Sequence, residues 1–322
     1  MQRSLTGIKP TNEPHLGNYL GAIRPALRLA ESFESFLFIA DYHALTTTRD
    51  PEAMRAHTYD VAATWLACGL DPEQIHLYRQ SDVTEVFELS WVLACLIATG
   101  QLERGVSYKD ALAKGEAPNA GIFTYPVLMA ADIILYDADV VPVGRDQLQH
   151  LEVARDVAQR FNHVFGDDVL RVPAPKITEA PLVPGLDGQK MSKSKGNGIP
   201  LFASAKKLRK TVMKIVTGSE PLEEPVEAEG STVYALYSLI ASDDERAEMA
   251  KRLRGDDYGW GHAKQELYEG LERELGPMRE KYEALRADEH GLDRLLKEGA
   301  DRVRPTARAT VDRVRKATGI SR

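Results

Sequence analysis

The amino-acid sequence predicts an α/β protein, a doubly wound parallel sheet followed by a C-terminal all-helical domain. Two observations indicate this fold. Across residues 1–180, short β-like runs alternate with segments of helical periodicity, as in parallel strands whose connecting helices cover both faces of a sheet. Beyond Ser204 the pattern is helical almost to the end of the chain. The 322 residues, 43% of them hydrophobic, suffice for one large core or two medium ones.

Four strands are expected at residues 3–8, 35–40, 74–78 and 139–143. In such Rossmann-like sheets, ligands bind at the carboxyl ends of the strands. Each predicted strand ends in a polar or glycine-bearing loop, and the first loop leads into residues 15–18. Four such loops in a row predict a nucleotide-binding crevice at this edge of the sheet.

The first predicted helix has an apolar face that would pack on the sheet, formed by Leu16, Tyr19, Leu20, Ile23 and Leu27. Its N-terminus then points at the crevice. Six further helices are expected in the C-terminal part of the chain, at residues 205–216, 232–241, 243–253, 261–287, 292–298 and 307–318.

These patterns divide the chain into three parts. Residues 1–186 would form the sheet domain, within which residues 102–120 are a less periodic insertion, either a mobile flap or a contact surface. Residues 187–290 would form a loop and the helical domain. Residues 291–322 would form a last helix.

Composition excludes several classes of protein. No apolar run approaches the roughly 20 residues that a membrane helix needs, and the N-terminus leads into a strand rather than a signal peptide, so we expect a cytoplasmic protein. Cys68 and Cys95 lack the spacing of a metal site or a disulfide framework. Both lie in apolar helical pattern and are expected to be buried. No metal site is predicted.

The net charge of −7 argues against a general nucleic-acid coat, but the charges are unevenly distributed. Residues 171–215 hold ten Lys or Arg against two acids, and residues 216–250 hold nine acids against one Arg. The last 22 residues hold seven basic and two acidic side chains. Basic runs are usually solvated helix faces, but here they border a predicted phosphate site.

Two short motifs far apart in the chain indicate ATP chemistry. Residues 14–18, Pro-His-Leu-Gly-Asn, place His15, Gly17 and Asn18 at a helix N-terminus, where unpaired N–H groups and the helix dipole favour a phosphate. Gly17 would let an adenine or a ribose lie against the helix. Alone this motif is weak, because histidine and glycine at a turn are most often structural.

The second motif, Lys-Met-Ser-Lys-Ser at residues 190–194, is more specific. Lys190, Lys193 and Lys195 lie within six positions and repel one another unless an anion binds. A lysine on its flexible stem can follow negative charge onto a departing pyrophosphate. Together the two motifs resemble the HIGH and KMSKS signatures of class I aminoacyl-tRNA synthetases.

A predicted helix at residues 124–136 carries Tyr125, Met129, Asp132 and Tyr136 on one face. Asp132 lies in its most apolar part. Because burial of an unpaired carboxylate is costly, Asp132 requires either a structural partner or a ligand that donates a hydrogen bond. The residues alone leave both possibilities open.

This helix, residues 140–150 and residues 7–11 resemble bacterial tryptophanyl-tRNA synthetases, and the resemblance covers nearly the whole chain. It implies that Asp132 accepts the indole N–H of tryptophan, so that phenylalanine would leave a buried acceptor unpaired. It also implies a flat slot formed by Leu5, Gly7, Met129, Val141 and Val143, with His43, Tyr125 and Gln147 near the polar end of the amino acid.

The resemblance implies a reaction in which tryptophan attacks Mg²⁺-ATP to give tryptophanyl-adenylate and pyrophosphate, followed by transfer to the terminal ribose of tRNA(Trp). The catalytic residues would be His15, Asn18, Lys190, Ser192 and Lys193. ATP would be bound by Lys9, Pro10, Thr11, Gly17, Asn18, Gly144, Arg145, Asp146, Val183, Lys190, Met191, Ser192, Lys193 and Ser194.

The resemblance extends to partners. The helical region would recognise the anticodon, and the last helix would pack back toward the catalytic domain. Members of the family are homodimers, so the resemblance implies a homodimer here as well. Residues 91–97 and 102–120 are expected at its interface.

Two alternatives stay open, a tyrosine-specific relative and a non-catalytic tRNA-binding or regulatory paralogue. Tyrosine enzymes usually have a Gln-rich recognition helix where this chain has Leu128-Met129-Ala130, which favours tryptophan. Both lysines of the second motif, together with His15 and Gly17, are present, which favours a working enzyme.

Overall fold

The computed structural model describes residues 1–10, 14–115, 117–144, 148–177, 182–218, 226–255 and 257–320, and of His150 the backbone alone. In this part of the chain, one sheet of five parallel strands has the order β3-β2-β1-β4-β5. The strands are β1 (Arg3–Ile8), β2 (Glu34–Ile39), β3 (Ile75–Arg79), β4 (Val140–Val143) and β5 (Ala174–Ile177). The predicted α/β fold with a parallel sheet is confirmed.

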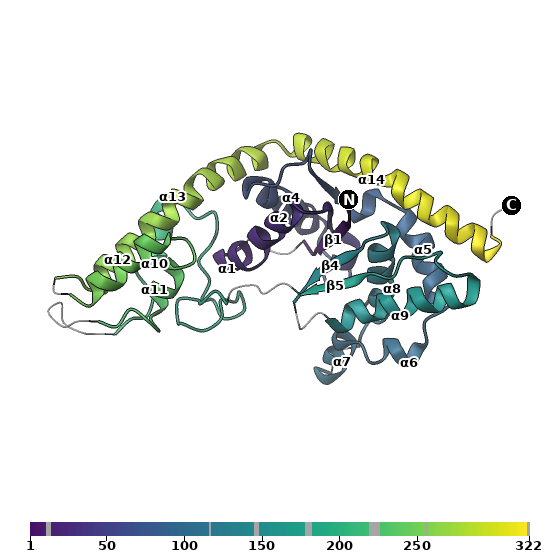
Figure 1. The fold of residues 1–322 in the computed structure, drawn as a ribbon, viewed down its shortest axis with the longest axis horizontal. Helices are drawn as coiled ribbons and strands as arrows, with labels where there is room; N and C mark the ends of the chain where they lie inside the picture. Colours follow the sequence, from purple (N-terminus) through teal and green to yellow (C-terminus); the bar gives the residue numbers. More distant parts are fainter. Residues whose placement is uncertain are drawn as a thin grey trace.

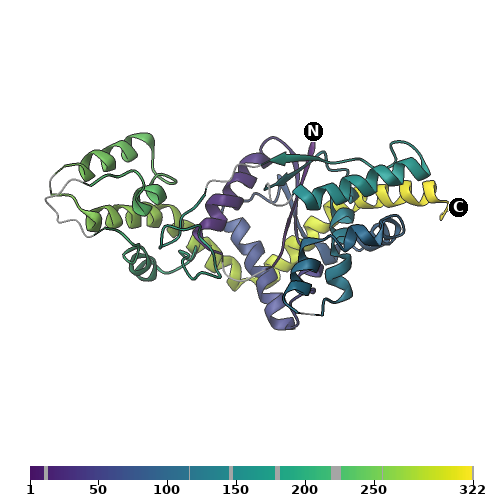
Figure 2. The ribbon, with the colours of Figure 1, turned by 90° about the horizontal axis from the view of Figure 1, so that it is seen from below.

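Helices cover both faces of the sheet (Figures 1 and 2). Those of the sheet region are α1 (Leu16–Asn18), α2 (Arg24–Ala30), α3 (Asp41–Ala44), α4 (Pro51–Ala67), α5 (Glu85–Ala94), α6 (Thr99–Leu102), α7 (Val106–Ala113), α8 (Ala120–Leu135) and α9 (Leu148–Phe165). One core cluster joins α1 and α4 to the helices of the C-terminal half. A second cluster joins α5, α8 and α9 on the other face.

The predicted strands match the structure to within one residue, but the edge strand β5 was not predicted. All four residues of β5 are exposed, and Pro175 interrupts the run. An edge strand of this kind shows no alternation of buried and exposed residues, and proline is tolerated there because one side of the strand needs no partner. The sequence pattern therefore carries no signal for it.

The first predicted helix is interrupted by one turn of π-helix, η1 (Tyr19–Ile23), between α1 and α2. Leu16, Tyr19, Leu20 and Ile23 are buried as predicted. Turns of π-helix occur frequently at functional sites. This one directly follows the first sequence motif.

The cysteine prediction is half wrong. Cys68 is buried, but Cys95 is exposed. Cys95 follows α5, a helix whose Trp91, one turn earlier, is 72% exposed. The sequence pattern predicts that this apolar face of α5 is part of the core, but in the structure it lies on the surface.

The C-terminal half contains α10 (Ala205–Val212), α11 (Thr232–Tyr237), α12 (Asp243–Leu253), α13 (Trp260–Ala287) and α14 (Glu289–Thr318). Figure 1 shows α10 to α12 in a separate lobe, from which α13 runs back to the sheet region. The separate helices predicted at residues 292–298 and 307–318 are wrong, because α14 is continuous through Gly299 and Pro305. Of the described helices, none combines the length and apolar character needed to span a membrane.

Helix α14 lies against β3 and α5, and its basic side chains are used in this contact. Arg315 pairs with Glu88, Arg308 with Glu85, and Arg313 with Asp137. The basic C-terminus is therefore largely neutralised by acids of the sheet region rather than left free for a phosphate.

At Gly299 the backbone of α14 lies close to the sheet. A Cβ atom at this position would lie 1.9 Å from the carbonyl oxygen of Leu77 in β3. We expect Gly299→Ala to lower the free energy of unfolding by about 1–3 kcal/mol, because backbone must move to admit the methyl group. Denaturant titration measures this change.

Gly261→Ala in α13 is the matched control, because a Cβ there meets no atom within 4 Å. Helix propensity alone should make this variant more stable, by roughly 0.5–1 kcal/mol. Equal stability of the Gly299 variant and the parent protein would contradict the close approach of α14 to β3.

Candidate active site

His15 caps the helix that begins at the carboxyl edge of the sheet. Its Nδ1 accepts a hydrogen bond from the backbone N–H of Asn18 at 3.3 Å, and Asn18 Oδ1 accepts one from the N–H of His15 at 3.0 Å. Burial, and to a smaller extent the charge of Lys193, lowers the pKa of His15. The imidazole is thus neutral at pH 7, and with Nδ1 acting as acceptor, Nε2 is left as the N–H donor.

The two sequence motifs are in direct contact. The N–H of Leu16 donates to the Ile199 carbonyl at 2.8 Å, and the N–H of Leu201 donates to the Pro14 carbonyl at 3.0 Å. Met191 is buried, and its Sδ accepts from the N–H of Gly17 at 3.2 Å. The second motif is therefore attached to the mouth of the first helix, although 174 residues separate Gly17 from Met191.

Glycines lie on both sides of this contact. A Cβ at Gly17 would lie 3.0 Å from the His15 ring and 3.3 Å from Met191 Cβ, and a Cβ at Gly198 would lie 3.3 Å from His15 Cβ. A side chain at either position would be tightly packed, and its neighbours would have to shift by a few tenths of an ångström. Gly17, which the sequence analysis predicts to contact a bound nucleotide, also packs against Met191 of the second motif.

Asn197, which the sequence analysis did not single out, organises the loop of the second motif. Its side chain is buried, accepts from the Ser192 N–H at 2.8 Å, and donates to Asp187 Oδ1 at 2.7 Å and to the Lys190 carbonyl at 3.3 Å. The loop also contains a contact between the hydroxyls of Ser192 and Ser194, 3.0 Å apart. A single asparagine thus connects residues on both sides of the turn. In the sequence, only the position of Asn197 close to the charged motif could have indicated this role.

We expect Asn197→Ala to slow adenylate formation about 10- to 100-fold, because three hydrogen bonds that shape the lysine loop are lost, each contributing about 1 kcal/mol. Tryptophan affinity should change less than twofold. Single-turnover kinetics and equilibrium binding measure the two quantities separately. Asn162→Ala is the control, because it removes an asparagine of α9 that likewise bonds backbone groups of a loop, the N–H and carbonyl of Leu170.

Lys190 and Lys193 are the cations of this loop. Both are exposed, and neither ammonium group forms a hydrogen bond or an ion pair within the described residues. Lys195 instead donates to Gln189 Oε1 at 2.7 Å. Two of the three lysines are thus available to an anion.

A cavity of about 960 Å³ opens at the same edge of the sheet. Its volume is at the upper end of the range for small-molecule sites. The predicted residues that line it are Leu5, Gly7, Lys9, Asn18, His43, Tyr125, Met129, Asp132, Val141, Val143 and Gly144. Pro10, His15, Gly17, Val183 and residues 190–194 lie outside its lining. Thr11, Arg145, Asp146 and Gln147 lie outside the described residues.

Asp132 is the buried acid of this cavity. It is 3% exposed, and its Oδ2 lies 2.9 Å from His43 Nε2. Gln80 Nε2 donates to both carboxylate oxygens at 2.8 Å. Burial raises the pKa of Asp132, and the contacts with His43 and Gln80 oppose this rise. The carboxylate thus has structural partners and also faces the cavity.

The slot beside Asp132 has apolar walls. Leu5, Val141 and Val143 are buried on adjacent strands, and Met129 lies one helical turn from Asp132. Phe38, which the sequence analysis did not assign, lines the same space. A Cβ at Gly7 would lie 2.6 Å from its ring, so the missing side chain makes room for Phe38.

The insertion at residues 102–120 also reaches the cavity. Ser107 and Asp110 of α7 and Lys114 at its C-terminal end line it, as does Lys9. Lys9 Nζ donates to Thr47 Oγ1 at 3.1 Å, and burial lowers the pKa of Lys9. The cavity thus has charged groups in its lining as well as the apolar groups of the slot.

A parallel sheet with paired HIGH-like and KMSKS-like loops at its carboxyl edge defines a class I aminoacyl-tRNA synthetase. The chain matches the family model described as class I tRNA synthetases (W and Y) over residues 2–276, and it belongs to this family. Within it, the chain groups with the tryptophan–tRNA ligases.

Two relatives illustrate this grouping. The tryptophan–tRNA ligase of Xylella fastidiosa (strain Temecula1) is 48% identical over 99% of this chain and 76% of its own length. That of Rhodopirellula baltica is 46% identical over 99% of both chains. The crystal structure of Campylobacter jejuni tryptophanyl-tRNA synthetase complexed with ADP and tryptophan has a TM-score of 0.93 and 39% identity, over 99% of this chain and 100% of that one.

Proposed function

We propose that this protein is an ATP-dependent tryptophan–tRNA ligase. It activates L-tryptophan to tryptophanyl-adenylate and transfers the amino acid to tRNA(Trp). The observation that carries the proposal is the position of Asp132, a buried carboxylate facing an apolar slot beside the two joined signature loops. An indole ring fits such a slot because it is flat and apolar and carries one N–H donor.

In the first step, a carboxylate oxygen of tryptophan attacks the α-phosphorus of ATP, an O–P bond forms, and the bond to pyrophosphate breaks. Lys190, Lys193 and Ser192 stabilise the charge that develops on pyrophosphate, and the Nε2–H of His15 donates to a phosphate oxygen. In the second step, a hydroxyl oxygen of the terminal ribose attacks the acyl carbon, the bond from that carbon to the phosphate oxygen breaks, and AMP leaves with the hydroxyl proton on its phosphate. Positioning and charge stabilisation suffice for both steps.

Magnesium enters as part of the substrate Mg²⁺-ATP. Across the described residues, no group of three His, Cys, Asp or Glu side chains could hold a metal ion. Lys9, Lys190 and Lys193 are cations, which do not ligate one. Mg²⁺ commonly keeps several waters and binds through substrate phosphates, so the ion would arrive with the nucleotide.

Two partners complete the proposal. The lobe of α10 to α12 would contact the anticodon region of the tRNA. A second copy of the chain would cover the apolar side chains exposed on α5 and α7, namely Phe87, Trp91, Val106 and Leu112, because exposed apolar patches mark interaction sites. Both helices pack on α8, which carries Asp132. We place the activity in the cytoplasm.

The test is exchange of labelled pyrophosphate into ATP, run in parallel with tryptophan, tyrosine and phenylalanine. Exchange with tryptophan alone is expected. Exchange with tyrosine would indicate the tyrosine-specific relative and overturn the assignment of Asp132. Exchange with none of the three would indicate a non-catalytic paralogue.

A further inference from the structure

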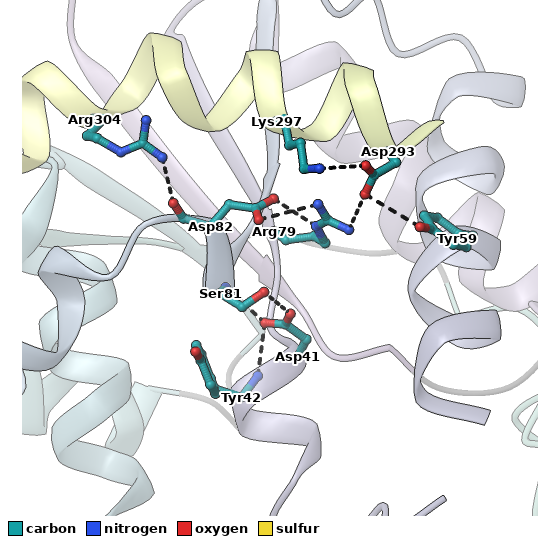
Figure 3. Close-up of polar contacts among 9 residues, drawn as sticks. All are labelled: Asp41, Tyr42, Tyr59, Arg79, Ser81, Asp82, Asp293, Lys297 and Arg304. Carbon is teal, nitrogen blue, oxygen red and sulfur yellow. Dashed lines mark hydrogen bonds and ion pairs between the residues drawn. The ribbon is translucent and has the colours of Figure 1, made fainter. Parts of the chain in front are cut away.

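A short turn of 3₁₀-helix, η2 (Gln80–Asp82), lies between the buried carboxylate of the cavity and helix α14. Each of its three residues contacts a different element, and Figure 3 shows the contacts of Ser81 and Asp82. Gln80 contacts Asp132 of α8. Ser81 donates from its N–H to Asp41 Oδ1 at 3.1 Å and also contacts Asp41 through its hydroxyl. The Asp82 carbonyl accepts from Arg304 of α14 at 2.7 Å.

The Gln80 side chain is arranged to donate. It is 2% exposed, and its Nε2 lies 2.8 Å from both oxygens of Asp132. Its Oε1 is buried, with no hydrogen-bond partner among the described residues. Since an unpaired buried acceptor is costly, the contact with the carboxylate outweighs that loss. The reverse amide orientation would place Oε1 against the carboxylate, so the hydrogen-bond pattern fixes the assignment.

Residues of α14 contact the turn and the residue that precedes it. Arg79, the residue before it, pairs with Asp82 at 2.7 Å and with Asp293 of α14 at 2.8 Å. Arg304 lies about three turns further along α14 and donates to the Asp82 carbonyl, as Figure 3 shows. Two contacts from α14 thus fix both ends of a three-residue turn.

We propose that Gln80 is a positioning residue for tryptophan selection, which holds the Asp132 carboxylate ionised and oriented toward the cavity while α14 holds the turn that carries Gln80. This inference rests on the proposed function. Gln80 does not line the cavity, so it acts on the substrate only through Asp132. His43 is the other group that contacts the carboxylate, and it lines the cavity itself.

The first test is Gln80→Met, which keeps the length of the side chain and removes the donor. Loss of a hydrogen bond to a charged group should raise KM for tryptophan about 10- to 100-fold. KM for ATP should change less than twofold. Unchanged tryptophan kinetics in a folded variant would overturn the proposal.

The pH profile separates positioning from general loss of structure. Without Gln80 the pKa of Asp132 rises further, because one of the groups that oppose the effect of burial is gone. The acid limb of kcat/KM for tryptophan should then move to higher pH. The other groups facing Asp132 are His43, which remains in place, and the phenols of Tyr78 and Tyr136, whose pKa values are raised and which stay neutral over this range.

Two further variants complete the experiment. Gln74→Met removes another glutamine that donates to an aspartate, Asp71, at 2.9 Å on the surface, and should leave both KM values unchanged. Arg304→Met removes one of the two contacts between α14 and the turn and leaves the contact of Arg79 with Asp293 in place, and it should raise KM for tryptophan about two- to fivefold, since one part-buried hydrogen bond is lost. No change in the Arg304 variant would overturn the part assigned to this contact of α14.

Failure of this inference and failure of the proposed function give different results. If the parent protein shows no tryptophan-dependent exchange, the proposed function is wrong. If the parent is active and Gln80→Met behaves like Gln74→Met, the function stands and Gln80 has no positioning role.

Discussion

Replacement of Asp132 by alanine should lower kcat/KM for tryptophan about 10²- to 10³-fold, one of the two largest effects that we expect in this protein. The variant loses the buried carboxylate beside the apolar slot, and it leaves the donors of Gln80 and His43 without their acceptor. The penalty for phenylalanine should be much smaller, because phenylalanine offers no N–H. Discrimination between the two amino acids should therefore fall by a similar factor.

The measurement is amino-acid-dependent pyrophosphate exchange over a range of tryptophan and phenylalanine concentrations. Asp156→Ala serves as the control, since Asp156 is exposed on α9 and bonds Gln101 far from the slot. Equal tryptophan affinity in the Asp132 variant and the parent protein would remove Asp132 from the slot. Acid pH should mimic the substitution, because a carboxyl whose pKa is raised by burial loses its charge at a higher pH than an exposed one.

Replacement of Lys193 by methionine should slow adenylate formation about 10²- to 10³-fold, because a cation that stabilises charge on the leaving pyrophosphate acts mainly in the transition state. Tryptophan binding should change less than twofold, since Lys193 does not line the slot. Single-turnover measurements give the first quantity, and equilibrium titration with tryptophan gives the second.

An NMR titration of His15 supplies an independent readout of the same variant. The charge of Lys193 contributes to the lowered pKa of His15, so its removal should raise that pKa. Lys206→Met, which removes an exposed lysine on α10, should leave both the rate and the His15 titration unchanged. A parallel loss of tryptophan affinity in the Lys193 variant would show that the lysine acts on binding rather than on the chemical step.

The residues that sequence reasoning could place are those with a local signal. Strand β1, the helix with Asp132 on its buried face, and the two motifs all follow from spacing within one segment. Gln80 lies in a loop that was predicted at the sheet edge, but its partner Asp132 is 52 residues away. No sequence pattern around a glutamine indicates a hydrogen-bond partner that far away in the chain. Its role becomes visible only when the sheet brings both segments together.

Two other differences have the same physical origin. The run through Gly299 and Pro305 resembles a break in helical pattern, and only packing against Leu77 explains why glycine is needed inside one long helix. The face of α5 that carries Trp91 is as apolar as a core face, and yet it is exposed. Whether an apolar face packs inside the chain or against another molecule is decided by tertiary structure, which periodicity does not contain.

Helices α13 and α14 are the two longest helices of the described structure and follow one another directly in the chain. At 1.5 Å per residue, the 28 residues of α13 span about 42 Å and the 30 residues of α14 about 45 Å. They meet at Asp288, and Arg286 and Tyr282 fasten the joint to Asp60 of α4 at 2.6 and 3.0 Å. The distance between the outer lobe and the cavity is therefore set by two long helices whose junction is held against α4. A tRNA that contacts the outer lobe and the cavity at once, as we propose, must therefore match this distance as well as carry the right sequence.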